Sequence, residues 1–277
     1  MASFIKREII VEAFRKKIAE GKPVIGFGAG CAMTAKCGEK AGADYISIYT
    51  TAICRIEGVP SLMPWLPYGN VNDDVYAAAK KILPLISKTP CVAGVGVHDP
   101  RIDVEELIDR FTAIGFSGVN NEPFCSMYGE KMCAILSKMG IGFNRELELM
   151  ETARRKGVFT LGWAANQEEA VALAQAGTDV VGLLASMDEP GESRNEHFQR
   201  VLSEMTQWSA AAKAARADVM TLAHGGPLSD VKTAQEALRI CRVDGYATGS
   251  SGERIPAETA ITETVRGFCG MELSGHE

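Results

Sequence analysis

Short, continuously apolar runs bounded by glycine alternate with amphipathic segments along the whole chain. Such runs are typical of parallel strands that are buried on both faces. Strict alternation of strands and helices predicts a parallel sheet whose crossover connections are helical. The eight predicted strands are Val24–Gly28, Tyr45–Tyr49, Cys91–Val97, Gly118–Asn120, Phe159–Trp163, Val180–Leu184, Val219–Ala223 and Gly245–Thr248.

The amphipathic segments carry apolar residues at helical spacing. At three places, Ala41–Asp44, Ala113–Gly118 and Ala176–Asp179, a predicted helix ends at a glycine and the next strand begins within a few residues. The segment Arg7–Ala19 precedes the first strand and is expected to cap the bottom of a barrel. The other predicted helices are Val75–Ile86, Val104–Ile114, Glu146–Lys156, Glu168–Ala176, His197–Ala212 and Val231–Ile240.

The count of eight βα units favours a closed barrel over an open sheet. A (β/α)8 TIM barrel needs about 250 residues. This α/β chain has 277, so we expect a single domain over residues 1–277 with an N-terminal capping helix. An open doubly wound sheet would carry a nucleotide fingerprint after its first strand. Gly26–Gly30 contains three glycines at the wrong spacing, and no acidic residue ends the second strand. The sequence therefore argues against dinucleotide binding.

Composition and charge exclude several classes of protein. Hydrophobic residues make up 46% of the chain and charged residues 23%, a balance typical of a globular protein. The net charge is −6, without the Lys and Arg cluster of a nucleic-acid-binding protein. No apolar stretch reaches the roughly 18–20 residues of a membrane span. The eight cysteines form no C-x-x-C pair, which favours free thiols in a reducing cytoplasm over disulfides or a zinc site.

The interval from Thr50 to Asp74 shows no clear periodicity and is predicted to be a long loop. Loops longer than about 12–15 residues are usually functional or disordered. Trp65 and Tyr68 argue against disorder. Because the loop follows the second strand, we expect a lid or an oligomer contact at the catalytic face, with a structural filling of the barrel opening as the alternative.

Two glycine-rich turns near the C-terminus point to an anion site. His224-Gly-Gly-Pro227 follows the seventh predicted strand, and Gly249-Ser-Ser-Gly252 follows the eighth. Glycine lets the backbone approach a ligand closely, and exposed N–H groups in such turns can bind an anion. In TIM barrels the loops after strands 7 and 8 are a frequent phosphate site. Ordinary β-to-α turns are the alternative interpretation.

Several motifs together carry a family resemblance that spans about Ile10 to Phe268. The chain resembles the phosphoenolpyruvate hydrolase-like family of TIM-barrel signal transduction proteins, whose domain also forms the C-terminal part of a plant virus-resistance protein. The resemblance implies a barrel related to the phosphoenolpyruvate mutase and isocitrate lyase superfamily. Members of that superfamily make or break C–C or P–C bonds next to a 2-oxo acid through an Mg²⁺-stabilised enolate. The motifs are Gly26–Gly30, Thr34–Lys36, Pro67–Asn70, Phe116–Asn120, Glu146–Glu148, His224–Pro227 and Gly249–Arg254.

Two departures from the superfamily weaken that implication. The superfamily carries a catalytic Lys-Cys-Gly loop, but Lys36-Cys-Gly38 lies in the first βα unit on a predicted helix, so we interpret the match as coincidence. The superfamily also places an aspartate at the end of strand 2, where this chain has Tyr49-Thr-Thr51. The chemistry of the mutases and lyases is therefore in doubt for this chain.

Residues that directly follow the third strand are expected at the mouth, the end of the barrel where the carboxyl ends of the strands meet. His98 is a candidate acid or base, because imidazole titrates near neutral pH; a packed histidine is the alternative. Asp99 is a candidate Mg²⁺ ligand, or it caps the next helix from its Asp-Pro turn. Glu122, after the fourth strand, is the second candidate metal ligand, with outward-facing loop polarity as its alternative.

The remaining candidates complete a site for a small anionic substrate. Glu146 and Glu148 face different directions on a helix, and we expect Glu146 to point inward and act in catalysis with His98 and His224. For Arg254, a structural salt bridge with Glu253 at the start of the last helix is the alternative to anion binding. The expected substrate- or anion-binding residues are Gly28, Asn120, Gly225, Gly226, Gly249, Ser250, Ser251 and Arg254.

Two functions follow from this site. The first is an enzyme, a hydrolase or lyase that cleaves a C–C or P–C bond next to a 2-oxo acid through a metal-stabilised enolate, with Mg²⁺ as cofactor. The alternative is a non-catalytic or regulatory barrel that binds a phosphorylated or carboxylated small molecule. We expect a homo-oligomer in either case, and neither nucleic acid nor a membrane as partner.

Overall fold

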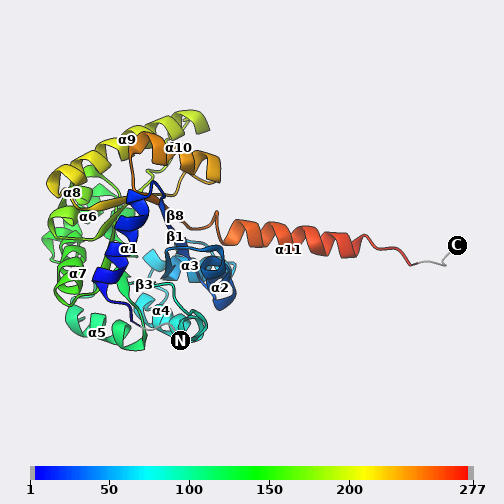
Figure 1. Ribbon diagram of the computed structural model, residues 1–277, viewed down its shortest axis with the longest axis horizontal. Helices are drawn as coiled ribbons and strands as arrows, with labels where there is room; N and C mark the ends of the chain where they lie inside the picture. Colours follow the sequence, from blue (N-terminus) through cyan, green and yellow to red (C-terminus); the bar gives the residue numbers. More distant parts are fainter. Residues whose placement is uncertain (1–3, 274–277) are drawn as a thin grey trace.

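The computed structural model describes residues 4–273 and contains a closed barrel of eight parallel strands (Figure 1). Each strand pairs with the next along the chain, and β8 closes the barrel against β1. This arrangement confirms the predicted TIM barrel. The strands are β1 (Val24–Gly28), β2 (Tyr45–Ile48), β3 (Cys91–Gly94), β4 (Gly118–Asn120), β5 (Phe159–Ala164), β6 (Val180–Leu184), β7 (Met220–His224) and β8 (Gly245–Thr248). The expected domain includes residues 1–3 and 274–277, which lie outside the described residues.

Helices surround the barrel, and their ends follow local sequence signals. The Asp103 side chain accepts hydrogen bonds from two N–H groups of the first turn of α5, and Gly115 ends that helix in the left-handed region at φ 117°. No helix within residues 4–273 has the length and apolarity to cross a membrane. The helices of the ring are α2 (Ala32–Ala41), α4 (Val71–Ile82), α5 (Val104–Ile114), α7 (Phe143–Arg155), α8 (Gln167–Gln175), α9 (Arg194–Ala215) and α10 (Val231–Cys241).

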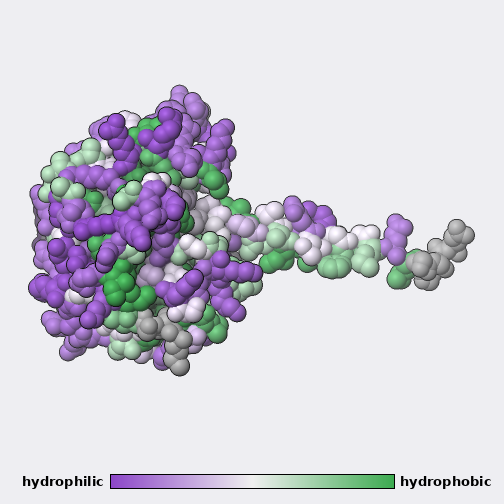
Figure 2. All heavy atoms as spheres, viewed as in Figure 1, coloured by the Kyte–Doolittle hydropathy of each residue, from purple (hydrophilic) through white to green (hydrophobic). Residues whose placement is uncertain are grey.

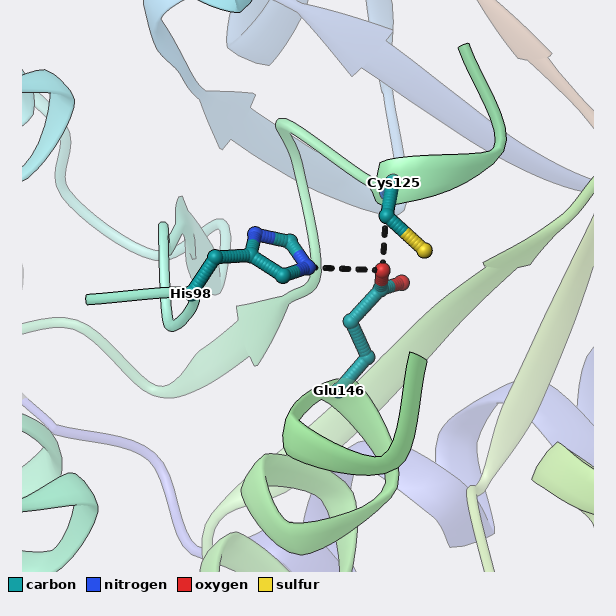
Figure 3. A group of neighbouring side chains, drawn as sticks. All are labelled: His98, Cys125 and Glu146. Atoms are coloured by element: carbon teal, nitrogen blue, oxygen red, sulfur yellow. Dashed lines mark hydrogen bonds and ion pairs between the residues drawn. The ribbon is translucent and has the colours of Figure 1, made fainter. Parts of the chain in front are cut away.

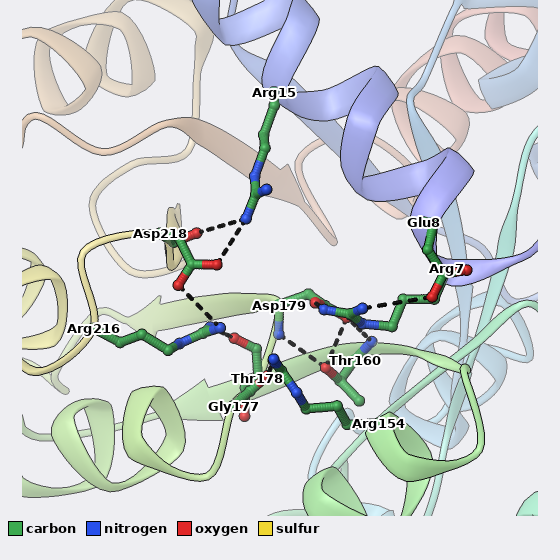
Figure 4. Close-up of polar contacts among 10 residues, drawn as sticks. All are labelled: Arg7, Glu8, Arg15, Arg154, Thr160, Gly177, Thr178, Asp179, Arg216 and Asp218. Atoms are coloured by element: carbon green, nitrogen blue, oxygen red, sulfur yellow. Dashed lines mark hydrogen bonds and ion pairs between the residues drawn. The ribbon is translucent and has the colours of Figure 1, made fainter.

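The helix α1 (Arg7–Ala19) covers the bottom of the barrel, as predicted. Its Phe14 packs edge-on against Phe159 of β5, with ring centroids 5.5 Å apart. Arg7 donates to both carboxylate oxygens of Asp179, from Nε at 3.0 Å and from Nη2 at 2.6 Å. Asp179 also accepts from the backbone N–H and the hydroxyl of Thr160, both at 3.1 Å (Figure 4). One buried carboxylate therefore joins α1 to two neighbouring strands.

The prediction of an aperiodic loop from Thr50 to Asp74 is wrong. The helix α3 (Thr50–Ile56) begins two residues after β2, a 3₁₀ turn follows at Met63–Trp65, and α4 already begins at Val71. With seven residues, α3 makes only about two turns, shorter than the window of roughly 11–18 residues over which helical spacing is recognised. Residues 95–97, predicted as part of the third strand, leave the sheet after Gly94. A further helix, α6 (Glu130–Lys138), was not predicted.

The hydrogen bonds and the ion pair of Asp179 should make a large contribution to the free energy of unfolding. We predict that Asp179→Asn lowers the free energy of unfolding by about 3 kcal/mol, because it leaves Arg7 without its charged partner in a site where the carboxylate is 2% exposed. The matched control is Asp218→Asn, whose side chain is 55% exposed and pairs with Arg15. The control should cost less than about 1 kcal/mol. Urea unfolding measures both, and equal losses would contradict the prediction.

Candidate functional site

Side chains from several strand ends converge on Tyr49, the residue that follows β2. Three glycines leave room for this convergence. A Cβ on Gly28 would lie 2.3 Å from the Tyr49 hydroxyl oxygen, and a Cβ on Gly94 would lie 2.4 Å from the Tyr49 Cβ. A Cβ on Gly249 would lie 3.2 Å from both Arg55 Nη1 and His224 Cε1. The structure thus places the predicted residues Gly28, Gly249 and His224 around one point at the mouth.

A buried ion pair between Arg55 and Glu253 lies beside Tyr49. Arg55 Nη2 donates to Glu253 Oε2 at 3.3 Å and to the Tyr49 hydroxyl oxygen at 3.1 Å. Glu253 Oε1 accepts from the Gly30 N–H at 2.6 Å and from the Thr34 hydroxyl at 2.7 Å. Within residues 4–273, Arg55 Nε is buried without a hydrogen-bond partner. The mouth therefore offers a guanidinium group with an unmatched donor.

Arg55 and Glu253 were not among the predicted site residues. Arg55 lies in the interval that was predicted to be a loop. The sequence feature that could have identified Arg55 is its charge, which stands alone in the apolar run Ala52–Ile56. Glu253 was considered only as a partner for its neighbour Arg254. The ion pair joins residues 198 positions apart in the sequence, so no local pattern reveals it.

Glu122 is a buried carboxyl group at the end of β4. Its Oε1 accepts a short hydrogen bond from the Thr51 hydroxyl, whereas Oε2 finds no partner among the described residues. Burial raises the pKa of Glu122 to about 7. The predicted residue Asn120 supports this segment: its Oδ1 accepts from the Glu122 N–H at 3.0 Å, and its Nδ2 donates to Ser47 Oγ at 2.9 Å. Asn120 thus orients Glu122 from below.

His224 ends β7, and its ring is held by one backbone contact. Nδ1 lies 2.7 Å from the Ala247 carbonyl oxygen, so Nδ1 carries the proton and donates it to that oxygen. The ring lies 4.9 Å from the Trp163 ring, between centroids. Burial lowers the pKa of His224, so the imidazole is neutral at pH 7 with Nε2 free to accept a proton.

The turns after β7 and β8 hold the other predicted anion-binding residues, and these residues do not all face the same point. Gly225 and Gly226 both adopt positive φ, 84° and 54°, a conformation that favours glycine. Ser251 contacts the Thr248 hydroxyl at 3.1 Å and lines a hollow on the outside of the barrel. Ser250 is partly buried in the same turn. Arg254 pairs with Glu258 on the last helix at 2.6 Å. Anion binding by these residues stays a prediction.

Glu146, His98 and Cys125 form a second buried group (Figure 3). Glu146 is fully buried at the start of α7, and its Oε1 lies 3.0 Å from His98 Nε2 and accepts from the Cys125 N–H at 2.8 Å. Its Oε2 accepts a short bond from the Asn121 amide. Burial raises the pKa of the Cys125 thiol, which keeps it protonated. Both Glu146 oxygens are therefore occupied, and Glu148 is the exposed one of the pair.

The donor chemistry fits Mg²⁺ poorly. Mg²⁺ prefers hard oxygen ligands, mostly carboxylates and water. Asp99 faces Arg101, whose Nε and Nη2 donate to its two oxygens at 2.8 and 2.6 Å, and Glu122 offers one free oxygen. In the described part of the chain, only the His98–Cys125–Glu146 group brings three potential ligand atoms within 4.8 Å, and it includes nitrogen and sulfur. The Asp99–Glu122 metal site stays a prediction, and the chemistry proposed below uses no metal.

Comparison with known proteins places this barrel in a family. The family model described as phosphoenolpyruvate hydrolase-like matches residues 9–271. The ToMV susceptible protein tm-1(GCR26) of Solanum lycopersicum is 33% identical over 272 residues, which are 97% of this chain and 36% of that protein. The chain therefore spans about a third of the length of this relative.

Solved structures share the fold. A phosphonopyruvate hydrolase, crystallised with oxalate and Mg²⁺, has a TM-score of 0.62 at 14% identity, and the match covers 94% of this chain and 88% of that one. An oxaloacetate acetylhydrolase has a TM-score of 0.63 at 16% identity, with 96% and 89% covered. At these identities the likeness shows the fold alone. With the family match over residues 9–271, the chain belongs to the phosphoenolpyruvate hydrolase-like family.

Proposed function

We propose that the mouth binds a small 2-oxo acid and that the chain is an enzyme, a hydrolase or lyase that cleaves a C–C or P–C bond next to the oxo group. The observation that carries this proposal is Glu122, a buried carboxyl with a free oxygen and a pKa of about 7. Arg55 is close enough for its charge to favour the ionised form of that carboxyl. Perturbed carboxyl groups of this kind cluster at catalytic sites.

Arg55 and Tyr49 supply the donors for an anion. The Arg55 guanidinium has a free Nε–H, and guanidinium groups bind carboxylates strongly through charge-assisted hydrogen bonds. The Tyr49 oxygen accepts from Arg55, so its own O–H remains available to a substrate oxygen. Burial raises the pKa of Tyr49, which keeps that proton in place at neutral pH. Together these groups can stabilise an enolate oxygen as charge develops on it.

Proton transfer falls to Glu122. A group with a pKa near the operating pH populates both its acid and its base form, which is the best compromise for general acid–base catalysis. In a lyase reaction, ionised Glu122 takes the proton of a substrate hydroxyl through Oε2, that oxygen becomes a carbonyl as the adjacent C–C bond breaks, and protonated Glu122 returns the proton to the carbon that keeps the electron pair. In a hydrolase reaction, Glu122 takes the proton from the water that attacks next to the breaking bond and returns it to the departing carbon in the same way. His224, neutral with Nε2 free, is the second candidate base at the mouth.

The structural comparisons support the proposed class of substrate, and the cysteines support the proposed compartment. The phosphonopyruvate hydrolase and the oxaloacetate acetylhydrolase are named for 2-oxo acid substrates and share this fold. All eight cysteines of this chain are free thiols. Free thiols suit a reducing compartment, and we propose the cytoplasm.

A regulatory barrel without catalysis is the second candidate. It is favoured by Tyr49, which stands where the superfamily resemblance implies a strand-2 carboxylate, and by the poor fit to Mg²⁺. The two candidates share the anion site and differ in turnover. An assay in which a coupled dehydrogenase detects release of a 2-oxo acid product from 2-oxo and 2-hydroxy diacids distinguishes the two candidates. Product release supports the enzyme, and its absence supports the regulatory barrel.

Oxalate, a planar mimic of an enolate, should bind at the mouth in EDTA. We predict a Kd in the millimolar range or below by isothermal titration, and a loss of about tenfold or more for Tyr49→Phe and for Arg55→Lys, because each removes a hydrogen bond to the anion. Arg254→Lys is the control, since Arg254 pairs with Glu258 on the last helix. Loss of binding with Arg254→Lys alone would move the site to the turn after β8. Binding only in Mg²⁺ would contradict the metal-free site.

Glu122 should make stability depend on pH. Because its pKa is raised from 4.5 to about 7 in the folded state, its neutral form stabilises the fold at low pH, and this contribution is lost as the pH rises from about 4.5 to about 7. We predict that the unfolding free energy of the wild type falls by roughly 3 kcal/mol relative to Glu122→Gln over that range. Glu148→Gln, at an exposed position, should show no such trend. A pH-independent difference between wild type and Glu122→Gln would contradict the raised pKa.

A further inference from the structure

The carboxylate of Glu146 is buried with little positive charge around it. Hydrophilic side chains cover much of the barrel surface that Figure 2 shows, the usual place for carboxylates. Glu146 is an exception, because its side chain is fully buried. In the described part of the chain, the only basic group that pairs with it is His98, whose Nε2 lies 3.0 Å from Oε1. Burial raises the pKa of the neighbouring Glu169, and the charge of Glu146 raises it further. A cation at this place would supply the charge that the interior lacks.

Three side chains from separate segments converge on this carboxylate. His98 follows β3, Cys125 follows β4, and Glu146 lies in the first turn of α7. An imidazole nitrogen, the thiol sulfur and a carboxylate oxygen all lie within 4.8 Å of one another. Figure 3 shows the three side chains directed toward one point from three sides. Glu146 is 48 positions from His98 and 21 from Cys125, so a search for closely spaced Cys and His residues cannot reveal the group.

This set of donor atoms is typical of zinc. Zn²⁺ binds imidazole nitrogen, thiolate sulfur and carboxylate oxygen at about 2.0–2.3 Å in a tetrahedral arrangement. Such bonds place neighbouring ligand atoms roughly 3.4–3.6 Å apart, so the three atoms would have to move by about an ångström to hold the ion. The His98 side chain is 23% exposed, which gives an ion access from solvent and leaves room for a water ligand.

Hydrogen bonds behind the three side chains hold two of them in place. Asn121 donates to Glu146 Oε2 and to the Trp163 carbonyl oxygen, and its Oδ1 accepts from the Trp163 N–H at 2.7 Å. The Cys133 thiol on α6 donates to the Cys125 carbonyl oxygen at 2.8 Å. Outer hydrogen bonds of this kind orient the ligands of metal sites.

We propose that His98, Cys125 and Glu146 bind one Zn²⁺ ion, with water as the fourth ligand. On binding, the Cys125 thiol releases its proton to solvent, and the sulfur, His98 Nε2 and Glu146 Oε1 each share a lone pair with the ion. No oxidation state changes. The ion joins the segments after β3 and β4 to α7. None of the three ligands belongs to the anion site proposed above, so the two proposals stand or fall separately.

Titration of the metal-free, untagged full chain with Zn²⁺ tests the site. We expect one ion per chain with a Kd in the micromolar range or below, and a binding heat that depends on the buffer because the Cys125 proton is released. Cys125→Ser should weaken binding about tenfold or more, because a hydroxyl is a much poorer zinc ligand than a thiolate. Cys37→Ser, at an exposed cysteine, is the matched control and should bind like the wild type. A wild type that binds no Zn²⁺ at micromolar concentration, or equal affinities of the two variants, would overturn the proposal.

Co²⁺ in place of Zn²⁺ identifies the ligands by absorption. The wild type should show the thiolate-to-cobalt charge-transfer band and the strong visible bands of a tetrahedral site, and Cys125→Ser should lose the charge-transfer band. Glu146→Gln should lower the Co²⁺ affinity about tenfold or more, because it removes a charged ligand, whereas Glu148→Gln on the same helix should not. Circular dichroism checks that each variant keeps its barrel, and the wild-type spectrum needs no variant. A wild-type spectrum without the thiolate band would overturn the assignment.

Discussion

The arrangement of side chains at the mouth of the barrel depends on the buried ion pair between Arg55 and Glu253. This pair joins α3, which follows β2, to the turn after β8, while Gly30 and Thr34 bind the same carboxylate from the β1 side. A buried ion pair is tolerated only when further hydrogen bonds satisfy its atoms. Here Tyr49, Gly30 and Thr34 supply those bonds and leave one guanidinium donor free.

Three buried carboxylates at the mouth differ in how fully their oxygens are bound. Both oxygens of Glu253 accept hydrogen bonds, and so do both oxygens of Glu146. Glu122 has one bound oxygen and one free, and burial raises its pKa to about 7. Enzymes assign acid and base roles to carboxyl groups through such differences of environment. These differences favour Glu122 for the proposed proton transfer, whereas the oxygens of Glu146 are bound by His98, Asn121 and Cys125.

The sequence predicts the barrel well because strand and helix periodicity are local properties of the chain. The sequence predicts the site less well, because contacts between residues far apart in the chain determine which side chains meet there. The interval after β2 shows no clear periodicity because the seven residues of α3 make only about two turns, too few for helical spacing to be recognised, and this concealed Arg55. The role of Glu253 depends on a partner 198 positions away. Asp99 as a metal ligand stays a prediction, and in the structure Arg101 donates to both of its oxygens. The last helix, α11 (Arg254–Cys269), extends away from the barrel (Figure 1), and no local pattern in the sequence predicts this.

We infer that Arg55, Tyr49 and Glu122 form one anion site at the mouth without a metal. A crystal structure of the protein grown with oxalate and EDTA tests it most directly. We expect oxalate density within hydrogen-bond distance of the Arg55 guanidinium and the Tyr49 hydroxyl, next to Glu122 Oε2. Oxalate bound instead at the Gly225–Gly226 turn or beside Arg254, with the space next to Arg55 filled by water, would contradict it.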